Sequence, residues 1–573
     1  MLRNHRNDQL PGARPGPVES ARQARQARQA RRPRRTWAAA LVSAVALAVT
    51  AAAAGPAAPA APHPLPGAAH ARPGAAHGDE LSPDIRAIMA KPAYRHAQWG
   101  WLELDDSTGR VIHSQYPDQF FIPGSTAKLV SVSGAWHTLG SNHRFTTPVQ
   151  ALGHRHGSVL DGSLVLVGEG DLTMGGRTAP DGTVSYTPID HTYANDVPGA
   201  TLTPENPLAG LDRIARQVRR SGITQVHGDL AVDDRLFTSF DGLDPTPTPL
   251  IVNDNVIDLL TAPTAPGRPA RLSWRPQVAP YRVTSTVRTV AAGGTTDIEV
   301  SASPDGTRIT LSGTIAADAQ PVLRNSPVHD PAAFGRTALI EALARAGVTV
   351  GARPTGPNPT SVLPDSYRGT QRVAAYVSPV FSQYTKLIFK VSHNLGANLS
   401  ICLMAVSAGS HRCEDGFPVL RDFLVRAGID PTQAQLLDGR GGNPVDRVTP
   451  RLENEILHYW QGTPDADLFR EAQPILGVDG SLASVCEGQP VCPGRGKVWA
   501  KPGTVAGGDA LNERLAIGAQ TMGGYLAAGH GRLRTIYLAV NGASAPDIEG
   551  AIGLIDDQAR ILGILQQQAE AGR

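Results

Sequence analysis

FIPGSTAKLV, residues 121–130, is the stretch that decides the fold of this 573-residue sequence. Pro123 and Gly124 interrupt the chain just before a helical run, so Ser125 and Lys128 are expected one turn apart on the same helix face. A serine hydroxyl is a poor nucleophile at neutral pH and needs a neighbouring base. Desolvation lowers the pKa of a lysine, which can then accept that proton. The stretch predicts a nucleophilic serine at the beginning of a helix.

Two later stretches strengthen this prediction. SHN occupies residues 392–394, and KPGT occupies residues 501–504 after a predicted strand at 497–500. Taken alone, each residue has a plain structural explanation, because serine and asparagine often cap helices and a lysine at a strand end is usually a solvated charge. Ser-x-x-Lys, Ser-x-Asn and Lys-x-Gly in this order, however, form the motif set of the penicillin-recognising serine acyl-enzymes.

With these motifs the sequence resembles the D-alanyl-D-alanine carboxypeptidase/endopeptidase branch of the low-molecular-mass class C penicillin-binding proteins. An interval of 267 residues separates Ser125 from Ser392, and one of 109 residues separates Ser392 from Lys501. The long first interval fits that branch, which carries extra domains there. The resemblance covers residues 85–565. Further matching segments lie at residues 165–173, 438–442 and 474–482.

The resemblance implies an α/β fold: a serine transpeptidase/β-lactamase-like domain, with an antiparallel sheet and flanking helices, interrupted by a β-rich inserted region. We expect residues 81–145 and 363–573 to form the transpeptidase-like domain and residues 146–362 to form inserted domains without a catalytic constellation of their own. Apolar periodicity and turn residues indicate the main elements. Hairpins are predicted at 98–115 and 298–312, strands at 226–232, 520–528 and 533–540, and helices at 125–139, 208–221, 379–390 and 547–568.

For the reaction, the resemblance implies an acyl-enzyme mechanism on peptidoglycan stem peptides. Ser125 would attack the carbonyl of the penultimate D-Ala, and Lys128 would accept its proton. Ser392 would pass that proton to the leaving amine, and the charge of Lys501 would keep the electrostatic potential of the site positive. Asn394 would hydrogen-bond the substrate amide. Water would then hydrolyse the ester. β-Lactam antibiotics would inhibit the enzyme by acylating the same serine.

Substrate binding is predicted along the KPGT segment. The backbone N–H groups of Ser125 and Thr504 would form the oxyanion hole. The Thr504 hydroxyl and the Lys501 charge would bind the terminal carboxylate, with Gly503 between them in the strand. No metal ion or other cofactor is expected. The motifs leave open whether the leaving group is a single D-Ala, as for a carboxypeptidase, or a cross-linked peptide, as for an endopeptidase.

Three residues depart from the family pattern. His393 replaces an aspartate that points away from the substrate, and we interpret it, like the other histidines, as a surface or packing residue. Pro502 replaces a threonine, so a backbone donor and a carboxylate-binding hydroxyl are missing. A proline favours an edge strand, and its presence here predicts weaker binding of substrate and β-lactam. Arg440 replaces a serine of the segment at 438–442.

The N-terminal region predicts export. The first 35 residues hold ten arginines and two acidic residues, and an uncharged apolar run follows at 37–54. This pattern indicates a signal peptide at 1–54 and a disordered Ala/Pro linker at 55–80, with an uncleaved membrane anchor as the alternative. The protein would be secreted or associated with the cell envelope. Because these arginines account for the net charge of +2, the rest of the chain is mildly acidic and nucleic acid is not an expected partner.

The four cysteines lie in two pairs that are close in sequence, at 402 and 413 and at 486 and 492. An exported protein folds in an oxidising compartment, so two local disulfides are predicted. A zinc site lacks the usual C-x-x-C spacing, and free thiols are the other alternative.

Two other functions fit part of the motif set. A serine β-lactamase shares Ser-x-x-Lys, but the sequence offers no assignable Glu-x-x-x-Asn stretch to activate the deacylating water. A catalytically weakened protein that binds peptidoglycan or β-lactams is the second alternative, and Pro502 motivates it.

Overall fold

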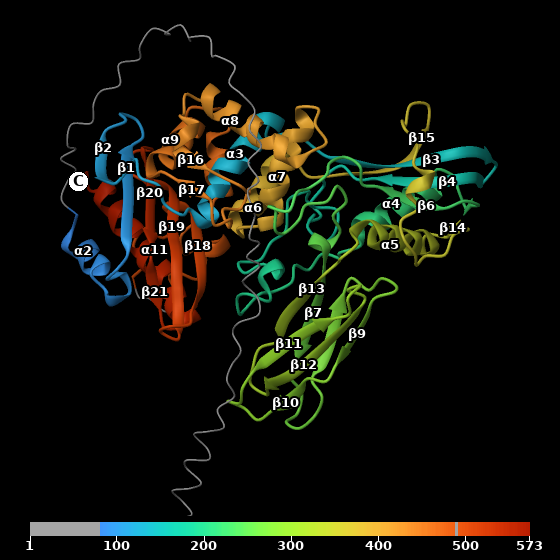
Figure 1. Ribbon diagram of the computed structural model, residues 1–573, viewed down its shortest axis with the longest axis horizontal. Coiled ribbons are helices and arrows are strands. Elements are labelled where there is room, and N and C mark those ends of the chain that lie inside the picture. Colours follow the sequence, from blue (N-terminus) through green and yellow to red (C-terminus); the bar gives the residue numbers. More distant parts are fainter. Residues whose placement is uncertain (1–80, 488–490, 573) are drawn as a thin grey trace, which may run out of the picture. The chain divides into compact units, whose positions relative to one another are not determined.

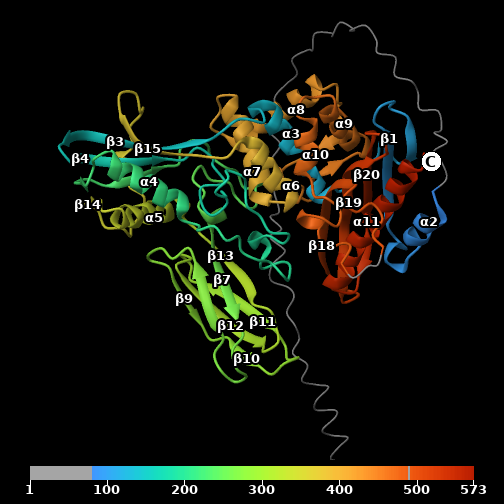
Figure 2. The same cartoon turned by 180° about the vertical axis from the view of Figure 1, so that it is seen from behind.

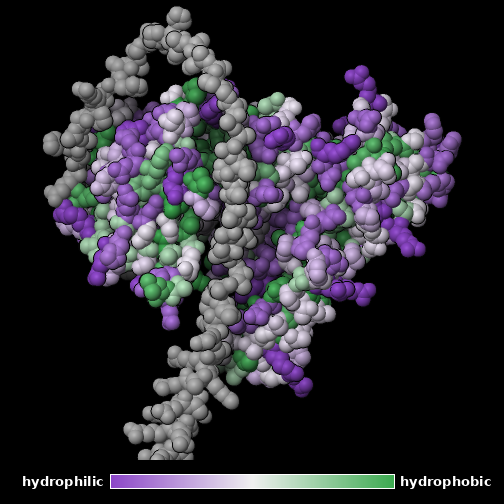
Figure 3. Space-filling model, viewed as in Figure 1, coloured by the Kyte–Doolittle hydropathy of each residue, from purple (hydrophilic) through white to green (hydrophobic). Residues whose placement is uncertain are grey.

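The computed structural model describes residues 81–487 and 491–572. The predicted signal peptide and linker lie outside these residues. Within the described ranges, no helix is long and apolar enough to cross a membrane. On the face shown in Figure 3, hydrophilic and hydrophobic side chains are mixed, because many of the large apolar residues are buried in clusters beneath the surface.

One antiparallel sheet is built from the beginning and the end of the described chain (Figures 1 and 2). Its main strands, in spatial order, are β18 (Val498–Asp509), β19 (Arg514–Ala527), β20 (Leu533–Asn541), β1 (Gln98–Asp105) and β2 (Val111–Gln115), and β21 (Ala543–Ala545) pairs with β19. The predicted hairpin at 98–115 is β1 and β2. Because β1 pairs with β20 along its whole length, the two distant segments form one sheet in which β18 is an edge strand.

Helix α11 (Ile548–Glu570) covers one face of this sheet, with α2 (Pro83–Met89) packed against it. Alternate residues of a strand face opposite sides, so the even-numbered apolar residues of β20 share one face. They pack in one cluster with apolar residues of α11. The cluster includes Ile536, Leu538, Val540, Ile561, Leu562 and Leu565.

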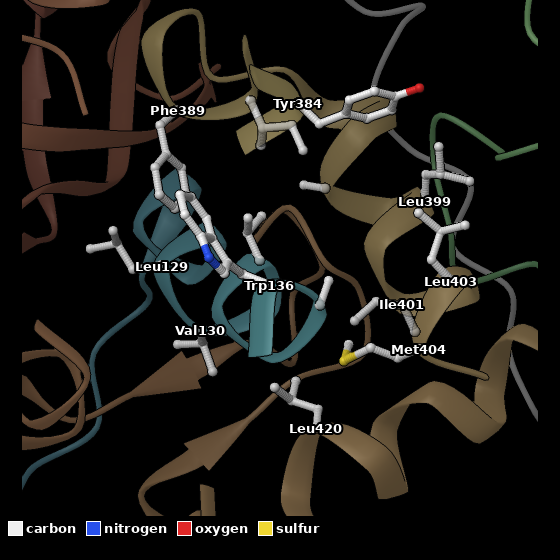
Figure 4. Close-up of a cluster of buried hydrophobic side chains, with 14 of the residues drawn as sticks. Leu129, Val130, Trp136, Tyr384, Phe389, Leu399, Ile401, Leu403, Met404 and Leu420 are labelled. Atoms are coloured by element: carbon white, nitrogen blue, oxygen red, sulfur yellow. The ribbon is translucent and has the colours of Figure 1, made fainter. Parts of the chain in front are cut away.

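A helical region covers the opposite face. Its helices are α3 (Ala127–Leu139), α6 (Phe381–Lys390), α7 (Asn394–Ser407), α8 (Gly416–Arg426), α9 (Pro450–Gln461) and α10 (Ala466–Ala472). Helix α3 is buried over most of its length, and its Trp136 ring lies 5.4 Å from the Trp460 ring. Figure 4 shows Leu129, Val130 and Trp136 on different sides of α3, and all three belong to one buried apolar cluster. This packing fixes the helix that carries Lys128.

The inserted region begins with a second sheet, flanked by α4 (Ala209–Arg220) and α5 (Pro331–Arg345). Its strands are β14 (Thr349–Val350), β5 (Gln225–Val226), β4 (Val159–Val167), β3 (Thr146–His156) and β15 (Gln371–Val377), and β6 (Leu230–Asp233) also pairs with β4. The sheet therefore extends beyond residue 362. The domain division at 362 stays a prediction, and the pairing of β15 with β3 favours a return to the transpeptidase-like domain after Val377.

The strand predicted at 226–232 is two short strands, β5 and β6, with Gly228 between them. A Cβ atom at Gly228 would lie 2.5 Å from the Gly162 carbonyl oxygen, so the chain passes too close to β4 there for any other residue. The predicted single strand is thus divided in two, although the His227 and Gly228 N–H groups between the parts still donate to the Leu160 and Gly162 carbonyls at 3.0 and 2.8 Å.

Two small sheets complete the inserted region. One contains β13 (Val322–Pro327), β7 (Val256–Ala262) and β8 (Arg271–Arg275), and the other contains β10 (Arg288–Val290), β12 (Arg308–Ala316), β11 (Asp297–Ala302) and β9 (Arg282–Ser285). The predicted hairpin at 298–312 is β11 and β12.

The remaining short elements are η1 (Pro92–Tyr94), η2 (Gly124–Thr126), η3 (His191–Tyr193), η4 (Asn253–Asn255), η5 (Thr360–Val362), η6 (Cys413–Asp415), η7 (Pro431–Gln433), β16 (Ala434–Gln435), β17 (Arg447–Val448) and η8 (Gly480–Leu482).

Both predicted disulfides are present. Cys402–Cys413 links α7 to η6, just before α8. Cys486–Cys492 closes the loop that leads into β18. The second disulfide therefore restrains the approach to the strand that carries Lys501.

Candidate active site

Ser125 and Lys128 are brought together at the beginning of α3. Ser125 lies in η2, and the Lys128 Nζ atom is 2.7 Å from its Oγ atom. Gly124 precedes them with φ +53°, a left-handed backbone that favours glycine. Ser125 is half-buried, whereas the Lys128 side chain is completely buried. The predicted one-turn spacing of the two residues is thus present, with the hydroxyl facing the amine.

The Lys128 amine is surrounded mainly by neutral oxygen atoms. Besides Ser125 Oγ, its Nζ atom lies 2.9 Å from Asn394 Oδ1 and 3.2 Å from the Arg440 carbonyl oxygen. Burial and the nearby Lys501 amine hold the pKa of Lys128 well below its usual range, and the Asp438 carboxylate opposes this only in part. A lysine with a strongly lowered pKa can act as a base near neutral pH.

Ser392 and Lys501 form a second hydroxyl–amine pair. Ser392 lies between α6 and α7, and its Oγ atom accepts a hydrogen bond from Lys501 Nζ at 2.9 Å. Burial lowers the pKa of Lys501 to about 7. Asn394 is the first residue of α7, and its Oδ1 atom faces the Lys128 amine. The five residues predicted to be catalytic therefore form two hydrogen-bonded sets, and the Lys501 amine of one is near enough to lower the pKa of Lys128 in the other.

Helix capping does not explain the two serines. Ser125 lies inside η2, and α3 begins after Thr126 without a side-chain cap. At α7 the cap is His393, whose Nδ1 atom accepts a hydrogen bond from the Gly396 N–H at 3.0 Å. Neither serine is therefore required for capping.

The backbone of β18 points its polar groups toward the open edge at alternate residues. The Ala500 N–H donates to the Pro474 carbonyl at 2.9 Å on that outer side. Strand alternation places the backbone groups of Pro502 and Thr504 on the same side. Pro502 therefore lacks a donor only where the sheet needs none, which agrees with the predicted edge strand. Thr504 is exposed, and its hydroxyl donates to Gln520 Oε1 at 2.8 Å.

Gly503 lets β18 approach the beginning of α3. A Cβ atom at Gly503 would lie 2.8 Å from Ser125 N and 2.5 Å from the Pro123 carbonyl oxygen. A Cβ atom at Gly124 would lie 3.0 Å from Thr504 N. The two glycines bring the N–H groups of Ser125 and Thr504 close together, as the predicted oxyanion hole requires.

The segment at 438–442 supports Lys128 through its backbone. The Asp438 carboxylate accepts hydrogen bonds from the N–H groups of Arg440 at 3.0 Å and Gly441 at 2.6 Å. This turn aims the Arg440 carbonyl at the Lys128 amine. The Arg440 guanidinium lies 3.5 Å from the Asp244 carboxylate and 3.3 Å from the Asp438 carboxylate. A charged side chain thus stands where the family pattern has the small hydroxyl of a serine.

His393 corrects the sequence interpretation. It is completely buried, caps α7 and places its Nε2 atom 3.3 Å from Asp254 Oδ1. It is therefore neither a surface residue nor simple packing. Asp254 and Tyr193, whose hydroxyl donates to the Ser392 carbonyl, come from the inserted region and were missed because no motif links them to Ser392. Among the described residues, no group of His, Cys, Asp or Glu side chains is arranged to hold a metal ion.

A comparison with protein families matches residues 81–552 to the D-Ala-D-Ala carboxypeptidase 3 (S13) family. The chain belongs to this family. It is accordingly a serine-type D-Ala-D-Ala carboxypeptidase, and the resemblance to the penicillin-binding proteins is confirmed.

Two curated relatives carry the same description. The D-alanyl-D-alanine carboxypeptidase of Actinomadura sp. (strain R39) is 28% identical over 459 residues, which are 76% of this chain and 78% of the relative. DacB of Haemophilus influenzae, also described as a D-alanyl-D-alanine carboxypeptidase, is 21% identical over 471 residues, 78% of this chain and 86% of the relative.

The solved structures confirm the fold. Penicillin binding protein 4 (dacB) from Haemophilus influenzae matches with a TM-score of 0.62 and 19% identity, covering 84% of this chain and 99% of that one. The same protein complexed with a β-lactam matches with a TM-score of 0.60 and 20% identity, covering 84% and 98%. The predicted transpeptidase-like α/β domain with an inserted region is therefore correct.

Proposed function

We propose that this family member is an exported D-Ala-D-Ala carboxypeptidase/DD-endopeptidase that acts on peptidoglycan stem peptides through a Ser125 acyl-enzyme and is inhibited by β-lactams. One observation carries the proposal: the completely buried Lys128 amine lies 2.7 Å from Ser125 Oγ and 2.9 Å from Asn394 Oδ1, and the Lys501 amine is near enough to lower its pKa. The names of the relatives support the substrate and the inhibitor class. The pattern at residues 1–54 supports export.

Acylation begins with proton transfer from Ser125 to Lys128. A neutral amine has two N–H groups and one lone pair. The two N–H groups can donate to Asn394 Oδ1 and to the Arg440 carbonyl, which leaves the lone pair for the Ser125 hydroxyl. As the Ser125 oxygen bonds to the carbonyl carbon of the penultimate D-Ala, its proton passes to Lys128. The N–H groups of Ser125 and Thr504 stabilise the oxyanion, a contribution of about 3–4 kcal/mol when such donors are well aimed.

The leaving amine is protonated from the second pair. Ser392 Oγ accepts from Lys501, so its own hydroxyl hydrogen is available to the departing amine. Lys501 then resupplies Ser392, a role that suits a lysine with a pKa of about 7. Lys501 and the Thr504 hydroxyl bind the substrate carboxylate at the edge of β18. Water finally attacks the ester carbonyl and gives its proton to Lys501, while Lys128 returns its proton to the departing Ser125 oxygen, which releases the shortened peptide and restores both amines.

The test is D-Ala release from a pentapeptide, run beside a gel that detects labelling by fluorescent penicillin. A carboxypeptidase releases D-Ala continuously and forms one penicillin adduct per chain, on the peptide that contains Ser125. Labelling of a Ser125→Ala variant at the wild-type level would contradict the assignment. Rapid clearance of penicillin would instead indicate a β-lactamase, and stoichiometric labelling without D-Ala release would indicate a binding protein.

A further inference from the structure

Ser392 is held in an unfavourable backbone conformation. Its φ angle is +61°, in the left-handed region that side chains other than glycine rarely occupy. Local bonds anchor the N–H side of the turn, since the N–H groups of Ser392 and His393 donate to the Phe389 and Ile388 carbonyls at 3.3 and 2.9 Å. These bonds do not hold the Ser392 carbonyl. The His393 N–H holds one side of the peptide group between Ser392 and His393, and the Ser392 carbonyl on the other side needs a partner of its own.

Tyr193 supplies this partner in the first of two contacts. It ends η3 in the inserted region, and its hydroxyl donates to the Ser392 carbonyl oxygen. Burial raises the pKa of Tyr193 above its usual range, so the hydroxyl stays protonated and remains a donor at every physiological pH. The contact fixes the peptide plane that follows Ser392.

His393 and Asp254 supply the second contact. Because His393 Nδ1 accepts from the Gly396 N–H, a neutral imidazole carries its proton on Nε2. That nitrogen faces Asp254 Oδ1 at 3.3 Å. Both groups are buried, and although the contact lies outside hydrogen-bond geometry, the carboxylate attracts the Nε2–H and so favours this tautomer of the ring that caps α7. The residue next to Ser392 is thereby tied to the inserted region.

Asp254 is itself held rigidly. Its Oδ2 atom accepts from Arg177 Nη2 at 2.7 Å and from His191 Nε2 at 2.8 Å, which leaves Oδ1 for His393. Although burial lowers the pKa of His191, the Asp258 and Asp190 carboxylates raise it to about 10. Arg177 also makes a bidentate ion pair with Asp190 at 2.6 and 2.9 Å. This buried cluster lies entirely in the inserted region and presents a single carboxylate oxygen to His393.

We propose that Tyr193 and Asp254 are positioning residues of the active site, which hold the Ser392–His393 peptide so that the Ser392 hydroxyl stays aligned with Lys501 and the leaving amine. The proposal rests on the proposed function of Ser392. It assigns to the inserted region a direct part in catalytic geometry. Neither residue touches the reacting atoms, so substrate binding should be affected much less than turnover.

The Tyr193→Phe variant tests the first contact, because it removes one hydroxyl and keeps the ring. We expect kcat for D-Ala release and the rate of penicillin acylation to fall about 5- to 10-fold, with KM changed less than 2-fold. Tyr376→Phe is the matched control. Its hydroxyl contacts Thr178 within the inserted region, so its loss should lower Tm without changing kcat. A wild-type kcat in Tyr193→Phe, with or without a lower Tm, would overturn the proposal.

His393→Asn tests the second contact and by itself leaves the Asp254 carboxylate of the cluster in place. Asparagine can still accept from the Gly396 N–H but has no donor in the place of Nε2. We expect a similar loss of kcat, and adding Asp254→Asn should then reduce kcat by less than a further 2-fold. Independent losses that multiply would show that Asp254 does not act through His393. If the wild type released no D-Ala, the proposed function would fail, while the acylation rates would still decide the positioning roles.

Discussion

Lys128 combines complete burial with a site in which most of its neighbours are neutral oxygens. An ammonium in such a place loses most of its hydration, which is why its pKa falls. The same environment costs folding stability, because the unfolded chain can protonate and hydrate the amine. The proposed role of Lys128 as a base and its unfavourable contribution to stability therefore have one physical cause.

The Lys128→Met variant separates these two effects. Methionine fills a similar volume without an amine, so we expect Tm to rise while penicillin acylation falls about 10²- to 10⁴-fold. Thermal unfolding and intact-mass kinetics measure the two changes. Lys497→Met is the control, because its amine makes an exposed ion pair with Glu570 and its loss should change neither quantity appreciably. Acylation at the wild-type rate in Lys128→Met would mean that another group is the base.

Pro502 offers a second test at the residue scale. If the missing threonine hydroxyl weakens carboxylate binding, Pro502→Thr should raise the acylation rate by penicillin, by about 10- to 100-fold at most, since one hydrogen bond to a charged group contributes roughly 1.5–3 kcal/mol. The strand should tolerate the change, because the new N–H would point to the open edge. An unchanged or slower acylation rate would instead indicate that Pro502 stiffens the strand for a different leaving group.

At the scale of elements, α9 carries an unusual acid at its interface with the main sheet. Glu453 is completely buried, and neither of its carboxyl oxygens has a hydrogen-bond partner among the described residues. Burial raises its pKa well above the usual range, so the folded protein keeps this proton to a higher pH than the unfolded chain does. Its contribution to stability is fully present below the unfolded pKa of about 4.3 and is lost as the pH rises.

Glu453→Gln should remove this pH dependence. Thermal unfolding at pH 5 and pH 8 should show the variant gaining Tm relative to the wild type at the higher pH, because glutamine does not ionise in the unfolded chain. Glu549→Gln, at an exposed position of α11, is the control and should give the same difference from the wild type at both pH values. An equal difference for Glu453→Gln at pH 5 and pH 8 would contradict the argument.

Elements that depend on local chemistry were predictable. Helix α3 ends at Gly140, whose φ of +85° favours glycine, and the hairpin of β1 and β2 follows from alternating residues around a polar turn. The break between β5 and β6 was not predictable in this way. Gly228 lies there against the β4 backbone, a contact that local periodicity cannot reveal.

At the scale of the whole molecule, the active site depends on segments that are far apart in sequence. The motifs placed Ser125, Lys128, Ser392, Asn394 and Lys501 in one group, and the structure brings them together. The part played by the inserted region was not predicted, because 199 residues separate Tyr193 from Ser392 and no spacing rule connects them.

The sequence by itself determined the family, the side chains proposed to react and most local elements, because short motifs and periodic apolar residues encode chemistry and local geometry directly. Only the tertiary structure decided what surrounds those side chains. Burial, which lowers the pKa values of Lys128 and Lys501, is a property of the packed helices and sheet. The contact of Asp254 with His393 likewise exists only once the inserted region has folded against α7, since a charge acts on a neighbour in space whatever their separation along the chain.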